Sequence, residues 1–177
     1  MRYEALDEYV NSEDVTMRKA RWHRRKTMAA IVVPYPETGQ TIRIKNADYE
    51  TILKHCKACA PEEACGLIAG HKEAETVYID KVYLLTNEDH SNEHFTMSPK
   101  EQLAAVKDAR ANKLAMLGNF HSHPESPSRP SEEDKKLAYD PNAIYMILSL
   151  MDPEEPLFRG FHIDQEKNVT VYTLVIE

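Results

Sequence analysis

The sequence LAMLGNFHSH, residues 114–123, decides the fold, because its apolar run ends in two closely spaced histidines. The run predicts a strand. Side chains two positions apart on a strand point to the same face, so His121 and His123 share one face and Ser122 points to the other. Two imidazoles on one face can both reach a metal ion at about 2.0–2.1 Å. The stretch therefore predicts a strand that ends in a pair of metal ligands.

A proline-rich segment follows this strand and predicts how a third ligand returns. Residues 124–130 contain three prolines, which favours a rigid loop. The loop leads into the sequence SEED, in which Asp134 offers a carboxylate oxygen. Two histidines and one carboxylate leave the fourth tetrahedral position open for water, as in catalytic rather than structural zinc sites. We therefore expect one Zn²⁺ per chain, bound by His121, His123 and Asp134.

Each half of this pattern also has an ordinary structural explanation. With 8 histidines in the chain, a His-x-His pair carries little weight alone, and both rings can be polar residues at a strand end. Ser131 and Asp134 have the spacing of a capping box at a helix N-terminus. One carboxylate oxygen cannot easily cap a helix and bind a metal together. The two halves at fixed spacing favour the metal site.

Together with Glu63-Ala-Cys-Gly66 upstream, the segments HSHP and SEED resemble the motif of the JAMM (MPN+) zinc metalloproteases. That motif has a glutamate, then His-x-His, a seven-residue gap, a serine, two further residues and an aspartate, and every position is filled here. The resemblance covers about residues 41–177. It implies an α/β (α+β) fold with a mixed β-sheet flanked by helices. It also implies a peptidase of the prokaryotic branch, which acts on ubiquitin-like or sulfur-carrier proteins.

The resemblance implies roles for the remaining site residues. Glu63, rather than the adjacent Glu62, would transfer the proton of the attacking water, and Ser131 would donate a hydrogen bond to the oxyanion. A solvated carboxylate is the ordinary alternative for Glu63. The implied substrate is a bond at the C-terminal tail of a β-grasp carrier, which we expect to lie extended along a strand edge. The leaving group stays open between cysteine, released from a sulfur-carrier adduct, and a lysine isopeptide.

Other classes of protein compete with this interpretation. A non-catalytic MPN scaffold usually lacks one or more ligands, whereas this sequence has them all. A zinc deaminase needs Pro-Cys-x-x-Cys after His-x-Glu, and no cysteine follows His123-Pro-Glu125. The net charge of −7, from 22 Lys and Arg and 29 Asp and Glu, predicts no nucleic-acid partner. No apolar run has the length of a membrane span, so we expect no membrane partner.

Beyond the site, hydrophobic periodicity predicts intermixed strands and helices. We expect Asn46 to cap a helix that Pro61 ends. A second helix is expected to begin at Ser98, with Leu103 and Ala109 facing the core. The other expected elements are strands over residues 41–45, 64–69, 76–85, 144–150, 158–163 and 169–176, and a short helix over 131–139.

Three cysteines lie close together in the sequence, at Cys56, Cys59 and Cys65. An odd number in so short a segment is no disulfide framework, so we expect a reducing, cytoplasmic setting. Cys56 and Cys59 form a Cys-x-x-Cys with no second pair, which favours partly buried helix cysteines over a thiol function. His90 and His94 lie in a polar loop and are expected to be exposed or at the rim of the substrate site.

Residues 1–40 are expected to form a charged N-terminal arm, partly helical or disordered, ahead of a catalytic domain over 41–177. The basic tract Arg18–Lys26 contrasts with a net charge of −8 over residues 41–177. The tract either folds onto the acidic surface of its own chain or is disordered, or else it docks on an acidic partner, a carrier or a second copy. A homodimer through the arm is one outcome of the second alternative.

Overall fold

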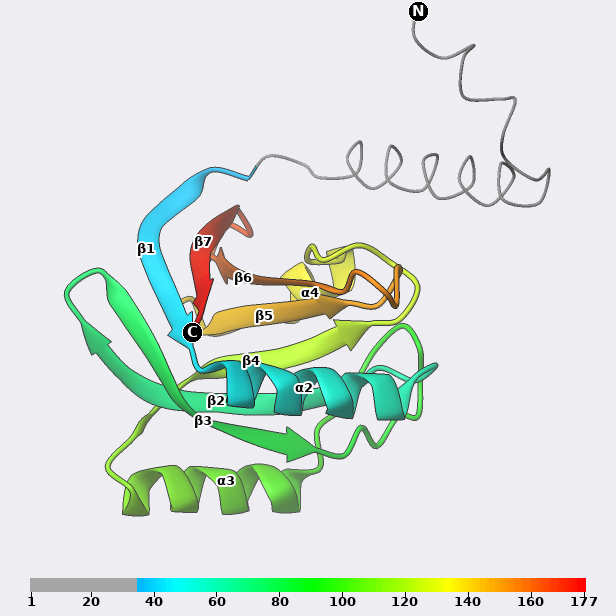
Figure 1. Ribbon diagram of the computed structural model, residues 1–177, viewed down its shortest axis with the longest axis horizontal. Helices are drawn as coiled ribbons and strands as arrows, with labels where there is room; N and C mark the ends of the chain where they lie inside the picture. Colours follow the sequence, from blue (N-terminus) through cyan, green and yellow to red (C-terminus); the bar gives the residue numbers. More distant parts are fainter. Residues whose placement is uncertain (1–34) are drawn as a thin grey trace, which may run out of the picture. The chain divides into compact units, whose positions relative to one another are not determined.

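The computed structural model describes residues 35–177, which form seven strands and three helices (Figure 1). The basic tract Arg18–Lys26 and most of the predicted arm lie outside the described residues. The elements are β1 (Glu37–Ile44), α2 (Asn46–Cys59), β2 (Cys65–Glu73), β3 (Thr76–Leu85), α3 (Pro99–Ala111), β4 (Ala115–His123), α4 (Glu132–Leu137), β5 (Ile144–Ser149), β6 (Leu157–Ile163) and β7 (Val169–Ile176).

The strands form one mixed sheet that closes into a barrel in the order β1-β3-β2-β4-β5-β6-β7. β1 runs parallel to both of its neighbours, β3 and β7, and β4 runs parallel to β5. The other neighbouring pairs are antiparallel. Figure 1 shows α2 crossing one face of the sheet and α3 lying along β3. The predicted mixed sheet with flanking helices is confirmed, and the closure through β1 and β7 is a feature that strand periodicity does not reveal.

The core lies under α2, and β5 passes through it with every residue buried. A strand that is parallel to its neighbour and covered on both faces reads as a continuous apolar run, which explains the sequence IYMIL. α2 contributes Ile52 and Cys56 to this core. The largest fully buried side chains of the described residues include Phe120, Phe161, Ile42, Ile44, Ile68, Ile144, Met146 and Leu148.

A bulge in β4 sets the face on which its last residues point. The register with β2 shifts between Ile68 and Ala69, which pair with Gly118 and Met116. Gly118 has φ +155°, and a Cβ there would lie 2.0 Å from the Ile144 carbonyl oxygen. Only glycine fits so close to the neighbouring strand, and a bulge of this kind redirects the side chains that follow it.

Three expectations for the local structure were wrong. β1 begins at Glu37 rather than at residue 41, because Glu37 pairs with Val171 of β7. Lys45, not Asn46, is the N-cap of α2, and the Asn46 N–H donates to the Glu177 carbonyl at 2.7 Å instead. Leu103 is 55% exposed, because α3 turns a stripe of small residues, Ala105 and Ala109, toward the sheet.

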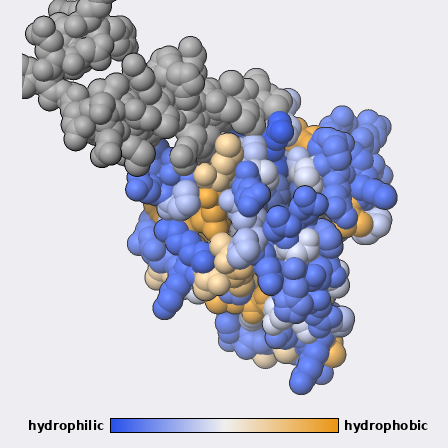
Figure 2. Space-filling model, turned by 90° about the vertical axis from the view of Figure 1, so that its right-hand side faces the viewer, coloured by the Kyte–Doolittle hydropathy of each residue, from blue (hydrophilic) through white to orange (hydrophobic). Residues whose placement is uncertain are grey.

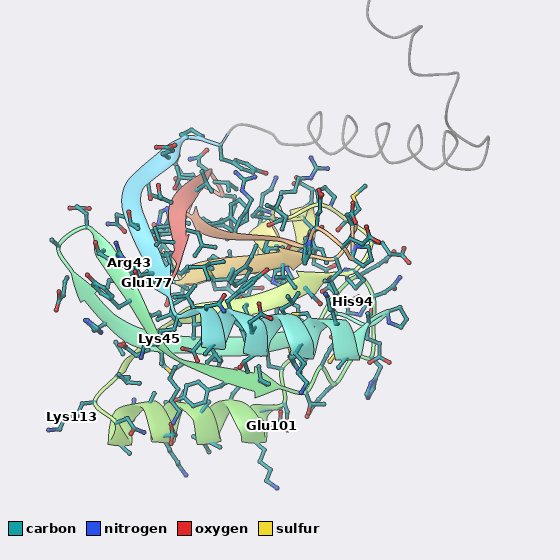
Figure 3. All side chains as sticks on the ribbon, viewed as in Figure 1. Arg43, Lys45, His94, Glu101, Lys113 and Glu177 are labelled. Carbon is teal, nitrogen blue, oxygen red and sulfur yellow. The ribbon has the colours of Figure 1, made fainter. Side chains whose placement is uncertain are left out.

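The barrel closes between β1 and β7, and polar contacts stabilise this closure at the end away from the histidines. Arg43 of β1 and Glu177 form an ion pair there, and the Glu177 N–H donates to the Ile44 carbonyl at 3.1 Å (Figure 3). His94 lies at the opposite end of the molecule in the same view. None of the described helices is long and apolar enough to cross a membrane.

Candidate active site

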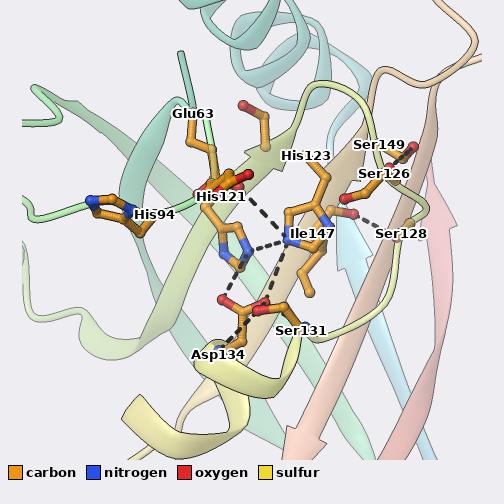
Figure 4. Close-up of polar contacts among 12 residues, drawn as sticks. Glu63, His94, His121, His123, Ser126, Ser128, Ser131, Asp134, Ile147 and Ser149 are labelled. Carbon is orange, nitrogen blue, oxygen red and sulfur yellow. Dashed lines mark hydrogen bonds and ion pairs between the residues drawn. The ribbon is translucent and has the colours of Figure 1, made fainter. Parts of the chain in front are cut away.

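The three predicted ligands converge at the carboxyl end of β4 (Figure 4). The Nε2 atoms of His121 and His123 lie 3.0 Å apart. Asp134 Oδ1 is 3.3 Å from His121 Nε2, and Asp134 Oδ2 is 3.4 Å from His123 Nε2. Both rings are buried, with 1% and 5% of their surface exposed. The structure thus brings together the group that the sequence predicted as metal ligands.

The loop of residues 124–130 fixes the second imidazole. Ser128 Oγ donates to the Ile147 carbonyl at 2.8 Å, and Ser149 Oγ donates to the Ser126 carbonyl at 2.7 Å, so β5 holds the loop at two points. The loop then presents the Pro127 carbonyl to His123 Nδ1 at 3.0 Å. A carbonyl only accepts, so Nδ1 carries the proton and the Nε2 lone pair faces the cluster, as a metal-binding histidine requires.

The electrostatics of the cluster suit a cation. Burial lowers the pKa of His121, whose ring stacks on Phe95 with centroids 4.9 Å apart. Burial also opposes charge on His123, but hydrogen bonds to Asp134 and Pro127 raise its pKa overall. Burial disfavours the Asp134 carboxylate, yet both histidines and Ser131 hold its pKa well below the usual range. Two buried nitrogen atoms and an ionised carboxylate facing one point are a donor set that fits a divalent metal.

Ser131 and Asp134 form a capping box, and this does not compete with the metal site. Ser131 is the N-cap of α4; its Oγ accepts from the Asp134 N–H at 3.0 Å. Asp134 Oδ2 accepts from the Ser131 N–H and from Ser131 Oγ, both at 2.7 Å. Oδ1 remains directed at His121. The capping box therefore uses one oxygen of the carboxylate, Oδ2, and leaves Oδ1 for the side of His121.

Glu63, and not Glu62, faces the cluster. Glu63 is 5% exposed, and its Oε1 lies 4.0 Å from His123 Nε2. Burial raises the pKa of Glu63 to about 8, with a smaller contribution from the nearby Asp134 carboxylate. Glu62 points outward and pairs with His90 Nδ1 at 3.1 Å. Geometry therefore selects the same carboxylate that the family motif selects, and it rules out the solvated alternative for Glu63.

A cleft of about 300 Å³ lies beside the ligands, between residues 93–96 and α4. Figure 2, which looks onto this end of the molecule, shows apolar patches that interrupt a hydrophilic surface. Tyr139 at the rim is 79% exposed and Leu137 is 48% exposed. The lining residues are Glu93, His94, Phe95, Thr96, Asn119, His121, Glu133, Asp134, Leu137, Tyr139 and Tyr145.

Sequence patterns predict part of this cleft but not all of it. His94 is exposed and lines the cleft, as expected of a rim residue, whereas His90 is exposed and pairs with Glu62. Asn119 was missed, although its even spacing from His121 on β4 places it on the same face. Its Oδ1 is buried and has no hydrogen-bond partner among the described residues. Tyr139 and Leu137 were missed because no pattern marks an apolar residue that stays exposed.

The fold and the cluster together define a class of protein. Its members have a mixed β-barrel with the two histidines of a His-x-His and an aspartate grouped at the end of one strand. Residues 45–161 match the family of prokaryotic homologs of the JAB domain. The chain belongs to this family, which confirms the JAMM resemblance.

Individual relatives agree with this assignment. The chain is 30% identical over 115 residues to the CysO-cysteine peptidase of Mycobacterium tuberculosis, covering 63% of this chain and 75% of that one. It is 30% identical over 105 residues to the desampylase of Haloferax volcanii, covering 56% and 74%. A solution structure of a protein from Desulfitobacterium hafniense is 44% identical, covers 77% of this chain and 92% of that one, and has a TM-score of 0.71. The predicted hydrolase is thus confirmed at the level of its class.

Proposed function

We propose that the chain is a zinc peptidase that hydrolyses a peptide, isopeptide or amide bond at the C-terminal tail of a ubiquitin-like or sulfur-carrier protein. The observation that carries this proposal is the buried His121, His123 and Asp134 group with Glu63 beside it and a cleft leading to it. Relatives named as a CysO-cysteine peptidase and as a desampylase support the substrate class.

The chemistry divides between the metal and the side chains around it. Zn²⁺ held by His121, His123 and Asp134 would act as a Lewis acid and lower the pKa of water to about 7. Glu63 would accept a proton from the attacking water and return it to the leaving amine. Burial raises the pKa of Glu63 toward neutrality. A carboxyl with such a pKa can both accept and donate a proton near neutral pH, as this role requires.

Ser131 would stabilise the negative charge that develops on the substrate oxygen. Its hydroxyl donates to Asp134 Oδ2 in the structure, so the proton must turn from that carboxylate toward the substrate. The Ser131 N–H also donates to Asp134 Oδ2 and would keep the carboxylate in place during this turn. Removing one such oxyanion donor typically lowers the rate by about 100- to 1000-fold.

The cleft beside the ligands would receive the tail of the carrier. Its exposed rim at Leu137 and Tyr139 suits contact with another protein. The unpaired Oδ1 of Asn119 would accept a hydrogen bond from a tail amide. These features support an extended tail between residues 93–96 and α4.

One experiment separates the leaving groups and tests the function. The purified protein is incubated with two conjugates of one carrier, the first ending in cysteine and the second joined to lysine by an isopeptide bond. Cleavage of either conjugate, lost on treatment with a chelator and restored by Zn²⁺, supports the proposal and names the leaving group. Intact conjugates with a zinc-loaded protein would instead favour the non-catalytic scaffold.

The arm and its setting stay predictions. A contact of Arg18–Lys26 with a carrier or a second copy should weaken as salt rises, because the Debye length falls from ~10 Å at 0.1 M to ~3 Å at 1 M. A truncation that tests it should keep Tyr35, whose ring packs on Phe161 with centroids 5.6 Å apart. If the truncated protein has the same Michaelis constant and the same mass in solution as the full chain at low salt, the contact is contradicted. The three free cysteines support a reducing, cytoplasmic setting.

A further inference from the structure

One buried side chain, Asn87, joins the loop between β3 and α3 to Glu63. Asn87 is 8% exposed. Its Nδ2 donates to the Glu63 carbonyl at 3.0 Å and to the His94 carbonyl at 3.2 Å. Its Oδ1 accepts from the Asp89 N–H at 3.1 Å and from the Thr96 N–H at 3.2 Å. These four bonds use the full donor and acceptor capacity of the amide.

The main chain of Glu63 is held by this loop on both sides. Its N–H donates to the Ser91 carbonyl at 2.7 Å, and its carbonyl accepts from Asn87. The bonds to β4 begin one residue later, where the Ala64 carbonyl accepts from the Ser122 N–H at 2.9 Å. Glu63 therefore lies just before the sheet, and the loop supplies the support that a strand would otherwise give.

The same loop forms one wall of the cleft. Residues 93–96 line it, and Phe95 stacks on His121. Asn87 binds the carbonyl of His94 and the N–H of Thr96, so it fixes both sides of Phe95. A single amide thus connects the wall of the cleft with the backbone of the proton-transferring carboxylate.

We propose that Asn87 is a positioning residue. It fixes the position of Glu63 relative to the cleft wall, so that the carboxylate is correctly placed when a tail binds. The inference rests on the proposed role of Glu63. Asn87 does not line the cleft, and its four bonds leave no capacity for substrate, so it acts through Glu63 and the loop. A displacement of about 1 Å in a reacting group can lower a rate by about 100-fold.

The first test substitutes Asn87 by aspartate and by alanine. Asn87→Asp keeps an acceptor for Asp89 and Thr96 but loses both donated bonds. We expect kcat to fall by about 10- to 100-fold with the Michaelis constant and zinc content nearly unchanged. Asn92→Asp adds the same charge at an exposed position of the loop and should keep wild-type kinetics. Where the aspartate variant does not fold, Asn87→Ala removes all four bonds without adding charge, and it should lower kcat and raise the Michaelis constant.

A double-mutant cycle separates positioning from a general structural role. Asn87→Asp should cause little further loss of kcat in a Glu63→Gln background, where the carboxylate is already absent. It should cause its full loss in a Ser131→Ala background, because Ser131 caps α4 and its hydrogen bonds are to residues of α4 rather than to the loop. An equal loss in both backgrounds would overturn the proposal.

Hydrogen exchange gives a readout that needs no turnover. The Glu63 N–H bonds the Ser91 carbonyl, and the bond from Asn87 to the Glu63 carbonyl holds the same residue against the loop. In zinc-loaded Asn87→Asp the Glu63 amide should therefore exchange faster than in the wild type. The amides of Asp89 and Thr96 should stay protected, because the aspartate still accepts from them. Unchanged protection of the Glu63 amide would overturn the proposal. If the wild type cleaves no conjugate, the proposed function fails, but this measurement still decides whether Asn87 anchors Glu63.

Discussion

The chain contains two short ligand-like motifs, His-x-His on β4 and Cys-x-x-Cys on α2, and the structure uses them differently. The Nε2 atoms of His121 and His123 face each other across 3.0 Å with Asp134 beside them. Cys56 is fully buried in the apolar core, and burial raises its pKa to about 12. Cys59 is half-buried with its pKa raised, again mainly by burial. Burial thus disfavours the thiolate, the reactive form, at both cysteines.

The His-x-His motif lies on one side of β4, and Cys56 of the Cys-x-x-Cys motif on α2 lies on the other side. Ser122, between the histidines, points to the other side of β4 and hydrogen-bonds toward Cys56. Its Oγ also accepts from the Ala64 N–H at 2.8 Å. The difference shows that the spacing of two residues in the sequence does not by itself make a metal site. The proline-rich loop brings Asp134 to the histidines as a third possible metal ligand, whereas no such group of ligands forms around the cysteines among the described residues.

The largest effect should follow from removing one ligand. In His123→Ala two ligands remain, so tight zinc binding and activity should both be lost, as measured by metal analysis after gel filtration. Cys56→Ala and Cys59→Ala are the matched controls on the other motif and should keep one zinc per chain. Full zinc content in His123→Ala, or loss of zinc in the cysteine variants, would reverse the comparison.

The next effect concerns the carboxylate beside the ligands. Glu63→Gln should keep the zinc and lose proton transfer, which lowers kcat by about 100- to 10,000-fold. Glu62→Gln changes a neighbouring carboxylate that faces solvent and pairs with His90, and it should keep activity. If Glu62→Gln were inactive and Glu63→Gln active, the assignment of the base would be wrong.

The sequence predicted which three side chains converge at the end of β4, because strand alternation and fixed spacing are local properties. The same alternation places Asn119, two residues before His121, on the ligand face. Asn87 could not be found, because its importance depends on four main-chain groups that only the folded loop brings together. The exposure of Leu103 was missed because helical periodicity does not say whether alanines or leucines meet the sheet. Barrel closure depends on the pairing of β1 with β7, which are far apart in sequence.

A smaller effect should appear in the stability of the metal-free protein. The pKa of Glu63 is raised from 4.5 to about 8, so the stability that it contributes is present below pH 4.5 and is lost as pH rises through 8. The glutamine of Glu63→Gln does not titrate. Its gain in free energy of unfolding over the wild type should therefore be larger at pH 9 than at pH 5, by about 2–4 kcal/mol. Glu62→Gln, the control, should show no such change between the two pH values.

Urea unfolding of chelator-treated protein at the two pH values measures this difference. His123 titrates in every variant, and its interaction with Glu63, which Glu63→Gln removes, is part of the measured difference. Asp134, whose pKa is lowered, titrates below this window. A Glu63→Gln variant with the same pH dependence as the wild type would show that the carboxylate is not held in an apolar setting.

The smallest effects should come from the cysteines, and they test whether Cys-x-x-Cys is packing alone. Cys56→Ala removes a fully buried sulfur and should lower the free energy of unfolding by about 1 kcal/mol. Cys59→Ala changes a half-buried side chain at the end of α2 and should stay within about 0.5 kcal/mol of the wild type. Neither variant should alter kcat/KM, because Cys56 lies behind β4 and its thiol is protonated. A tenfold loss of kcat/KM in Cys59→Ala, with stability unchanged, would instead give this thiol a part in the reaction and make the two motifs alike.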